Sequence, residues 1–377
     1  MDFSLTEEQQ LLKDSVDRFV RENYEFETRR KTAATSEGFT DENWKQMAEL
    51  GWLAVALPEE FGGIGGGATE TMVIMEGFGR GLVLEPFFAT VVLGANLIQQ
   101  AGNDAQKEDL LPKLAEGNLK LCFAYAERQA RFDLNDVETK AEKSGGGYTI
   151  NGAKGVVFGA AAADKIIVAA RTSGDTRDTN GITLFIVDSD AAGVSRRDYV
   201  TNDALRASEI AFENVFVDAS AVLGVADNGY SVIERVAEFA VAALCAEAVG
   251  CMDVLKEEPN EYIKTREQFG QPIGKFQVLQ HRMVDILINC EEARSMAYVA
   301  TAMMDSDDAE ERARSVAAAK AQIGKSARFV GQNSIQMHGG MGMTDEMKVG
   351  HYFKRLTMID LTFGDQDYHT KRFAAMT

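Results

Sequence analysis

YIKTREQFGQPIGKFQVLQ, residues Tyr262–Gln280, has the pattern of two helices joined by a tight turn. The first helical run carries Arg266 and stops at Phe269 and Gly270, and a second amphipathic helix begins near Phe276. An arginine held at a helix end offers planar, two-pronged hydrogen-bond donation to a phosphate. We therefore predict a helix, a turn and a second helix here, with Arg266 as a candidate phosphate ligand.

A second block, Gln336–Arg355, reads QMHGGMGMTDEMKVGHYFKR. Gly339, Gly340 and Gly342 leave backbone N–H groups uncovered at a point where the chain can approach a ligand closely. An RxxFG turn and a QxHGGxG loop, each at a helix end, are far more specific together than either is alone. The two blocks therefore indicate one ligand-binding surface.

The composition excludes several kinds of partner. The chain of 377 residues has a formal net charge of −19, which argues against binding to nucleic acid or to anionic membranes. Its four cysteines lack CxxC spacing and are expected to be reduced core residues. The four histidines lack metal-ligand spacing, so no metal site is expected. The polar start MDFSLTEEQQ and the lack of a long apolar run favour a cytoplasmic protein.

The order of patterns along the chain predicts three domains. Residues 1–118 have helical periodicity, with a capping box at Thr6–Gln9 and a second cap at Thr40. Residues 119–224 contain short alternating or β-branched runs bounded by turn residues: Leu121–Ala126, Gly147–Asn151, Lys165–Arg171, Ile182–Asp188 and Glu209–Val217. Residues 225–377 are helical again, with apolar seams at Leu279, Met283, Ile286, Cys290, Ala293 and Ala297, and at Val316, Ile323, Val330 and Met337. We expect an α+β, mainly α fold: an N-terminal helical domain, a middle antiparallel β domain and a C-terminal four-helix bundle.

These blocks and their order resemble the acyl-CoA dehydrogenase family, flavoenzymes that oxidise acyl-CoA thioesters to enoyl-CoA. The resemblance runs from Met1 to about Arg372 and implies FAD as cofactor, an acyl-CoA as substrate and an electron-transfer flavoprotein as acceptor. It also implies a surface that reaches the flavin of a neighbouring subunit. The residues that it places against FAD are Arg266, Gln268, Phe269, Ile273, Phe276, Gln277, Gln336 and Gly340.

The sequence departs from the family pattern where the flavin ring is held. The family's TExxAGSD-like loop corresponds to Ala126–Asp133, AERQARFD, which lacks the expected Thr and Ser hydroxyls. Its KxWITN strand corresponds to Lys154–Gly159, KGVVFG, which lacks the Trp and the Thr. The bulk of Arg131 and Phe158 can obstruct the ring instead of holding it.

The catalytic base is also missing from its usual places. The two positions at which members of the family carry the catalytic Glu hold Phe363 and Ala240 here, and neither side chain can take a proton. Asp360 and Glu247 are the candidate substitutes. Glu238 lies about 200° around a helix from Ala240 and is expected on the solvated surface.

Within the family, the resemblance is to the small subunit of pimeloyl-CoA dehydrogenase-type enzymes and to heteromeric steroid acyl-CoA dehydrogenases. The resulting hypothesis is a subunit that holds the dinucleotide of FAD while a homologous partner subunit supplies the Glu. Two alternatives stay open. One is a self-sufficient homotetramer with Asp360 as an atypical base, and the other is a non-redox CoA-ester-binding or scaffold protein of the same fold.

Overall fold

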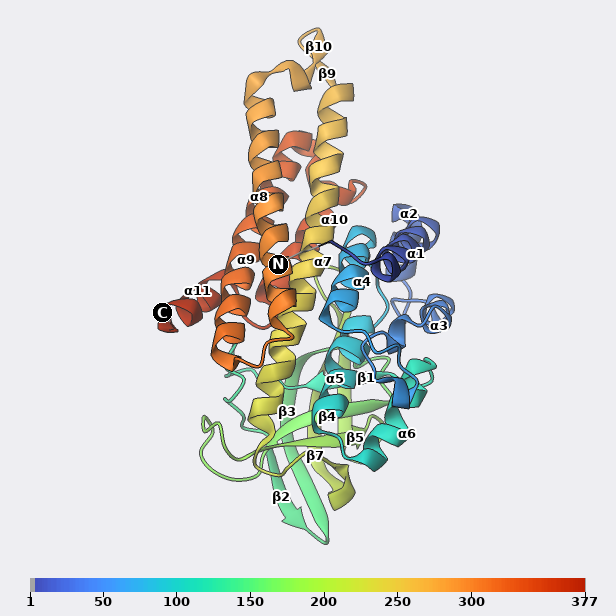
Figure 1. Ribbon diagram of the computed structural model, residues 1–377, viewed down its shortest axis with the longest axis vertical. Coiled ribbons are helices and arrows are strands. Elements are labelled where there is room, and N and C mark those ends of the chain that lie inside the picture. The colour runs from blue at the N-terminus through green and yellow to red at the C-terminus, as the bar shows by residue number, and fades with distance from the viewer. Residues whose placement is uncertain (1–3, 377) are drawn as a thin grey trace. The chain divides into compact units, whose positions relative to one another are not determined.

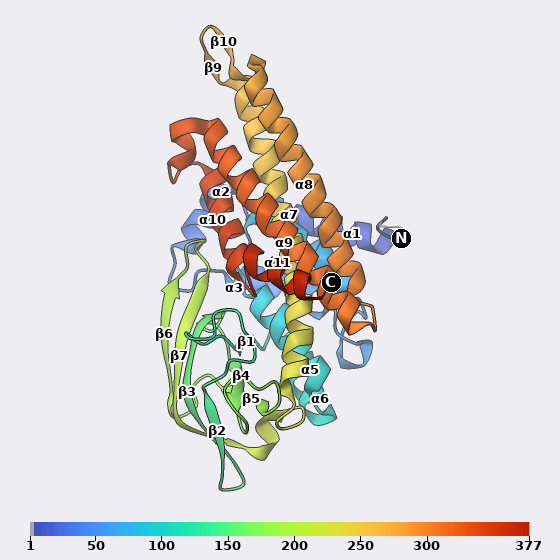
Figure 2. The same cartoon turned by 90° about the vertical axis from the view of Figure 1, so that its left-hand side faces the viewer.

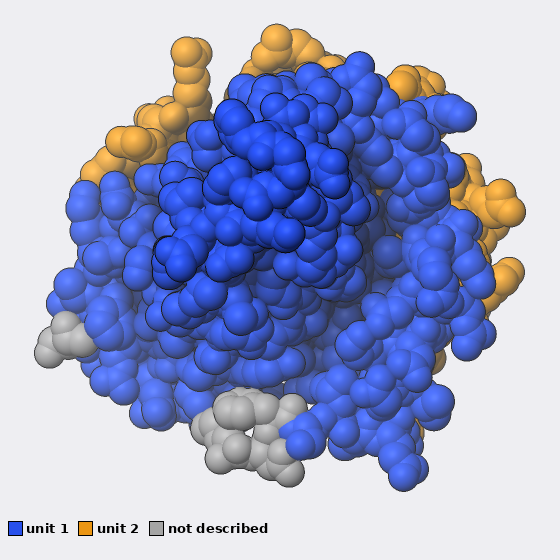
Figure 3. Space-filling view, turned by 90° about the horizontal axis from the view of Figure 1, so that it is seen from above, with its two compact units in different colours: residues 1–31, 68–83, 241–377 blue, residues 32–67, 84–240 orange. Residues whose placement is uncertain are grey.

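A computed structural model describes residues 4–376 of the chain as two compact units (Figure 3). The first unit consists of Met1–Lys31, Ala68–Val83 and Val241–Thr377, and the second of Thr32–Gly67 and Leu84–Ala240. Helices precede and follow a β-sheet along the chain (Figure 1), so the predicted mainly helical α+β fold is confirmed. The boundaries that we predict at residues 118 and 224 divide the chain by sequence pattern, and they stay predictions.

The N-terminal part forms helices whose starts the sequence encodes locally. The side chain of Thr6 accepts a hydrogen bond from the backbone N–H of Gln9 (3.2 Å), and that of Gln9 accepts one from the N–H of Thr6 (3.0 Å). The side chain of Thr40 accepts a hydrogen bond from the N–H of Asn43 (3.2 Å) at the start of its helix, so both predicted caps are confirmed. The helices are α1 (Glu7–Asn23), α2 (Phe26–Ala33), α3 (Asp41–Glu49), α4 (Ala68–Gly81), the π-helix η3 (Phe88–Ala95), α5 (Asn96–Ala101) and α6 (Asp104–Ala115).

The middle part forms one sheet with the order β6-β7-β3-β2-β4-β5-β8, and β1 also pairs with β4 (Figure 2). The strands are β1 (Leu121–Ala124), β2 (Lys140–Ser144), β3 (Gly147–Phe158), β4 (Lys165–Arg171), β5 (Ile182–Asp188), β6 (Val194–Val200), β7 (Arg206–Asp218) and β8 (Val222–Leu223). Most neighbours are antiparallel, but β4 is parallel to β1 and meets β2 in parallel at one residue pair. The sequence missed β2 and β6, because most of their side chains are exposed and no apolar alternation marks them.

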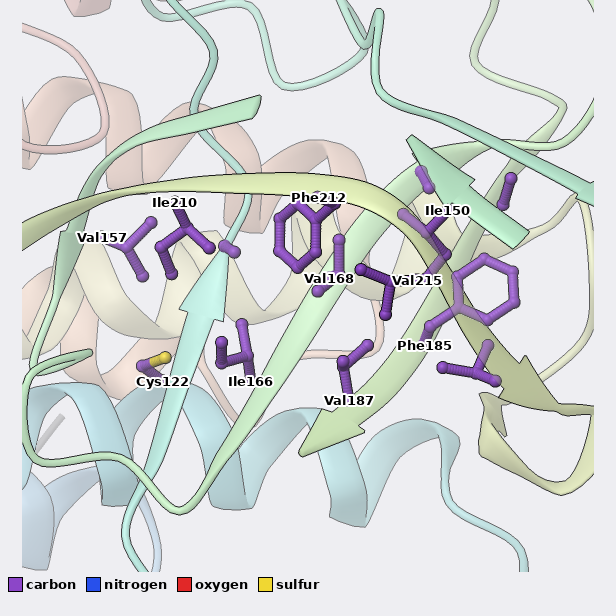
Figure 4. Close-up of a cluster of buried hydrophobic side chains, with 14 of the residues drawn as sticks. Cys122, Ile150, Val157, Ile166, Val168, Phe185, Val187, Ile210, Phe212 and Val215 are labelled. Atoms are coloured by element: carbon purple, nitrogen blue, oxygen red, sulfur yellow. The ribbon is translucent and has the colours of Figure 1, made fainter. Parts of the chain in front are cut away.

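One face of the sheet carries the hydrophobic core of the second unit. Buried side chains from β1, β3, β4, β5 and β7 meet there, among them Cys122, Ile166, Phe185 and Phe212 (Figure 4). Successive side chains of each strand point to opposite faces of the sheet, and in β1, β4 and β5 both faces are buried, which is why these strands read as continuous apolar runs.

The C-terminal part consists of long helices joined by tight turns. They are α7 (Gly229–Thr265), α8 (Gln277–Met303), α9 (Ala309–His338), α10 (Lys348–Leu361) and α11 (Gln366–Ala375). The hairpin of β9 (Glu267–Gln268) and β10 (Gln271–Pro272) joins the far ends of α7 and α8 (Figure 1). In the predicted seams, Ile286, Cys290, Ala293 and Ala297 of α8 and Val316, Ile323, Val330 and Met337 of α9 are buried. Leu279 and Met283, nearer the hairpin, are half-buried.

Candidate functional site

The turn after α7 presents an arginine and an aromatic ring to the outside. The N–H of Ile273 donates to the carbonyl of Arg266 (2.8 Å), which closes the hairpin across its base. Phe269 lies at the tip with φ of +55°, and its side chain is 90% exposed. Its ring meets the edge of Phe276, with a centroid distance of 6.0 Å. An exposed large aromatic residue on a strained backbone is characteristic of a contact surface.

The glycine loop lies beside the last turns of α7. The ring of His338, at the end of α9, packs at a tilt of 32° against the ring of Tyr262, with a centroid distance of 4.5 Å. Its Nδ1 lies 2.7 Å from the carbonyl of Ser334, and the hydroxyl of Ser334 donates to the carbonyl of Leu255 (2.6 Å). The end of α9 is therefore fastened to α7, which brings the two predicted blocks together.

The residues of this surface leave hydrogen-bond donors available to a ligand. In residues 4–376, the side chains of Arg266 and Gln336 are exposed and have no hydrogen-bond partner. A Cβ added to Gly339 or Gly340 would meet nothing within 4 Å, so the packing of the chain does not require these glycines. Gln268 and Gln277 are exposed, and Ile273 and Phe276 are half-buried beside them. An arginine, an amide and open backbone form a donor set that suits the phosphates of a dinucleotide.

Residues Asp360–Gly364, which are the end of α10 and the start of the loop after it, are held from within. The ammonium of Lys320, a side chain with no exposed surface, donates to the carbonyls of Asp360 (2.8 Å), Thr362 (3.0 Å) and Gly364 (2.6 Å). Burial lowers the pKa of Lys320 to about 8. Three acceptors need three N–H donors, which only the protonated form provides. The loop therefore has one defined conformation, with Phe363 at φ of +56° and buried.

The acidic residues near this loop have structural partners. One carboxylate oxygen of Asp360 accepts a hydrogen bond from the N–H of Gln366 (3.1 Å). A Cβ added to Gly324 would lie 2.2 Å from the same oxygen, so this oxygen lies directly against α9. Burial raises the pKa of Asp360. Glu247 forms two hydrogen bonds of 2.6 Å with Arg355, and both residues are buried.

The other two positions singled out in the sequence lie on the part of α7 that belongs to the second unit. Ala240 is buried. Glu238 is buried as well, and its carboxylate lies 4.0 Å from the guanidinium of Arg235. The expectation that Glu238 is solvated is therefore wrong, because helical periodicity alone does not show which faces of a long helix have neighbours.

A buried ion pair, which the sequence analysis does not predict, organises the loop after β1. The ammonium of Lys154, on β3, donates to Glu127 (2.6 Å) and to the carbonyl of Tyr125 (3.3 Å). Glu127 also accepts hydrogen bonds from the N–H groups of Glu138 (2.8 Å) and Thr139 (3.1 Å). Burial by itself raises the pKa of Glu127, but Lys154 and these donors hold it below its usual value.

Within residues 4–376, no three His, Cys, Asp or Glu side chains are grouped so that they could hold a metal ion. In the same residues, no helix has both the length and the apolar content needed to cross a bilayer.

Comparison with known proteins gives matches along nearly the whole chain. The acyl-CoA dehydrogenase N-terminal, middle and C-terminal domain models match residues 6–118, 122–215 and 227–376. Mitochondrial isovaleryl-CoA dehydrogenase of Pongo abelii is 30% identical over 370 residues, which is 96% of this chain and 87% of the relative. A variant of the Tcur3481–Tcur3483 steroid ACAD has a TM-score of 0.88 at 26% identity, covering 98% of this chain and 97% of that one. The FAD complex of PigA has a TM-score of 0.91 at 26% identity, and the match covers 100% of this chain and 98% of that one.

Proposed function

The chain belongs to the acyl-CoA dehydrogenase family, and on this premise we propose that it is one subunit of a heteromeric, FAD-dependent acyl-CoA dehydrogenase. In this proposal the chain holds the dinucleotide part of FAD, and a homologous partner subunit supplies the carboxylate that removes the α proton of the acyl-CoA. An electron-transfer flavoprotein accepts the electrons.

The observation that carries the proposal is the absence of an acid where the resemblance places the base. Phe363 and Ala240 occupy the two positions, and both are buried. The nearest substitutes have other roles: Glu247 pairs with Arg355, and Asp360 accepts from the N–H of Gln366. A general base has to reach the proton that it removes, and a carboxylate held by other donors is poorly placed to do so.

The exposed surface of the α7–α8 end supports a role in holding a dinucleotide. Arg266 and Gln336 offer donors that no residue within 4–376 uses, and Gly340 leaves room for close approach. Arg266 would contact a phosphate of FAD, Gln336 and the backbone at Gly340 would contribute further donors, and Phe269 and Phe276 would cover an apolar part. When bound, FAD supplies the acceptor for the hydride that leaves the β carbon of the substrate.

An apolar strip on α8 supports a partner subunit. Val284, Leu287 and Ile288 recur at helical spacing and are between 45% and 54% exposed, and Val278 is 60% exposed. With Phe269, they form an exposed apolar surface that a second chain of the same fold could cover. The proposal therefore includes an interface that contains α8 and the hairpin.

The test is to purify the chain alone and together with a homologous chain encoded beside it, and to measure FAD per chain and enoyl-CoA formation. The proposal predicts little flavin and no turnover for the chain alone. For the pair, it predicts bound flavin and turnover. Arg266→Gln in this chain should lower the FAD content of the pair, whereas Arg18→Gln, at an exposed position on α1, should not.

The alternatives give different results in the same experiment. A lone chain with full flavin and turnover would be the self-sufficient homotetramer and would contradict the proposal. A pair that forms but stays without flavin would be the non-redox CoA-ester-binding or scaffold protein.

A further inference from the structure

Two strands of the second unit have open edges that border the same groove. β8 pairs only with Leu184 and Phe185 of β5, so within residues 4–376 the segment Ile186–Asp188 has β4 on one side and no strand on the other. β6 pairs with β7 only as far as Phe212, so in the same residues Val215–Asp218 have β3 on one side and no strand on the other. The ends of both strands line a groove of about 460 Å³, together with α6. The groove therefore lies between two edges at which a sheet can accept a further strand.

The backbone of β5 offers hydrogen bonds at this groove. Apart from its pairing with β4, the segment Ile186–Asp188 makes one backbone hydrogen bond among the described residues, in which its last carbonyl accepts from the N–H of Ala191 (3.1 Å). The next residue, Ser189, donates its N–H to the carbonyl of Asp164 (3.0 Å) on the β4 side. Because neighbouring residues of a strand point their N–H and C=O groups to opposite sides, those of Ile186 point to the open edge.

Hydrogen bonds hold α6 against the end of the sheet, so the groove is formed before a ligand binds. The side-chain amide of Gln106, on α6, donates to the carbonyls of Ser220 (3.0 Å), in the 3-10 helix η4 (Ala219–Ala221), and of Val222 (2.9 Å), in β8. The backbone N–H of Gln106 is held in turn by the side chain of Asn103, the N-cap of α6 (2.9 Å). A preformed groove spares a ligand the free-energy cost of ordering its binding site.

The floor of the groove is apolar. Val187, which Figure 4 labels, and Val217 line the groove and belong to the buried hydrophobic core of the second unit. Phe216 also lines it, and its side chain is 48% exposed. An aromatic ring left half in solvent beside an open strand edge is typical of a surface that a partner covers.

The rim of the groove is acidic. It carries the carboxylates of Asp109, Asp188 and Asp218 against one ammonium, that of Lys165. Asp188 pairs with Lys165, and Asp109 pairs with Lys113 outside the groove, both in exposed positions where an ion pair is weak and can exchange its partner. The side chain of Asp218 is exposed and has no partner among residues 4–376. The charge of the rim therefore favours a cationic ligand.

We propose that this groove binds an extended polypeptide segment of another protein, in which lysine or arginine alternates with apolar residues. The segment pairs as an added strand with the open edge of β5 at Ile186. Successive side chains of a strand point to opposite faces, so the apolar side chains can cover Phe216 while the cations meet the acidic rim at Asp218. The inference does not depend on the proposed function, because every residue that lines the groove belongs to the second unit and the surface around Arg266 belongs to the first.

The experiment measures the fluorescence anisotropy of a labelled eight-residue peptide that alternates lysine and valine, titrated with the full chain at low ionic strength. A peptide in which glutamate replaces lysine should bind about tenfold more weakly or worse, because its charge is wrong for the rim. The lysine peptide with methyl groups on alternate backbone nitrogens should lose about as much, because strand pairing needs its N–H groups. Spermine, a cation without a peptide backbone, should not displace the lysine peptide at equal concentration.

Two variants and a second measurement locate the binding. Asp218→Lys should weaken binding of the lysine peptide by about threefold or more, and its melting temperature should be unchanged because the Asp218 side chain has no partner. Glu22→Lys makes the same change of charge at an exposed position on α1 in the first unit, and it should leave binding unchanged. In the original chain, the peptide should slow hydrogen exchange of the backbone N–H groups of Ile186–Asp188.

Several results would overturn the proposal. Equal binding of the lysine and glutamate peptides, or of the methylated and unmethylated peptides, would show that neither the acidic rim nor strand pairing selects the ligand. Displacement by spermine, or equal weakening by Asp218→Lys and Glu22→Lys, would show only a general attraction of cations to an acidic protein. Unchanged hydrogen exchange at the end of β5 would place the peptide elsewhere, and this measurement needs no variant.

Discussion

Glu247 and Arg355 form a buried two-pronged ion pair, in which Nε–Oε1 and Nη2–Oε2 are both 2.6 Å apart. The pair joins α7 to α10 inside the first unit. It also gives a structural role to one of the two carboxylates that the sequence offered as a substitute base.

Glu247→Gln should therefore unfold more easily. Removing one charge leaves Arg355 buried without its counter-charge, which costs about 3–5 kcal/mol of the free energy of unfolding. Urea unfolding followed by circular dichroism measures this change. The control is Asp109→Asn, which breaks an exposed pair with Lys113 and should change the free energy by less than about 1 kcal/mol. Equal effects of the two changes would contradict the structural role.

Asp360→Asn separates a structural acid from a catalytic one. Asparagine keeps an oxygen that can accept from the N–H of Gln366, so turnover of the heteromer should stay within about twofold of the original. Asp360→Ala removes the acceptor and should lower the free energy of unfolding by about 1 kcal/mol. Steady-state rates and FAD content are measured for both variants. Loss of turnover in Asp360→Asn with FAD retained would identify Asp360 as the base.

Glu85 predicts a pH dependence of stability. Burial raises its pKa to about 7 from 4.5, so between these values the folded chain keeps a proton that the unfolded chain has lost. The contribution of Glu85 to the free energy of unfolding is therefore fully present below pH 4.5, and it is lost as the pH rises through 7. Glu85→Gln should be more stable than the original chain by roughly 2–3 kcal/mol above the window, and this difference should vanish below it. Urea unfolding at about pH 4 and pH 8 tests this expectation. If the free energy of unfolding of Glu85→Gln differed from that of the original chain by the same amount at both pH values, the expectation would be refuted.

Val156→Gly tests the backbone strain at the point where β3 shifts register against β7. Glycine adopts φ of +51° without the steric cost that a β-branched residue has there, typically about 1–3 kcal/mol. We expect the variant to be as stable as the original chain or more stable. Val200→Gly, at a 57% exposed position in β6, should be destabilised by about 1 kcal/mol because it has no such strain. Thermal unfolding of both variants gives the comparison, and a similar loss of stability in both would argue against strain at Val156.

Much of the fold could be predicted from sequence because its signals are local. The helix caps at Thr6 and Thr40, most of the apolar seams of α8 and α9 and the β-branched runs of β4 and β5 are each encoded within a few residues, and the structure has them where the sequence predicts them. Ala240 and Phe363, at the two positions where the resemblance leads us to expect an acid, could also be read from the sequence, because residue type needs no structure. Strands β2 and β6 could not, because their exposed side chains carry no periodic signal and only pairing with β3 and β7 orders them.

The partners of the charged residues depended on the tertiary structure. Lys154 and Glu127 are 27 residues apart, and Glu247 and Arg355 are 108 apart, so nothing in the chain's local pattern relates them. The sequence by itself determined the helices and the apolar strands, because their preferences act between residues that are close in the chain. Only the folded structure decided which charges are neutralised, because that depends on distances between residues that the fold brings together.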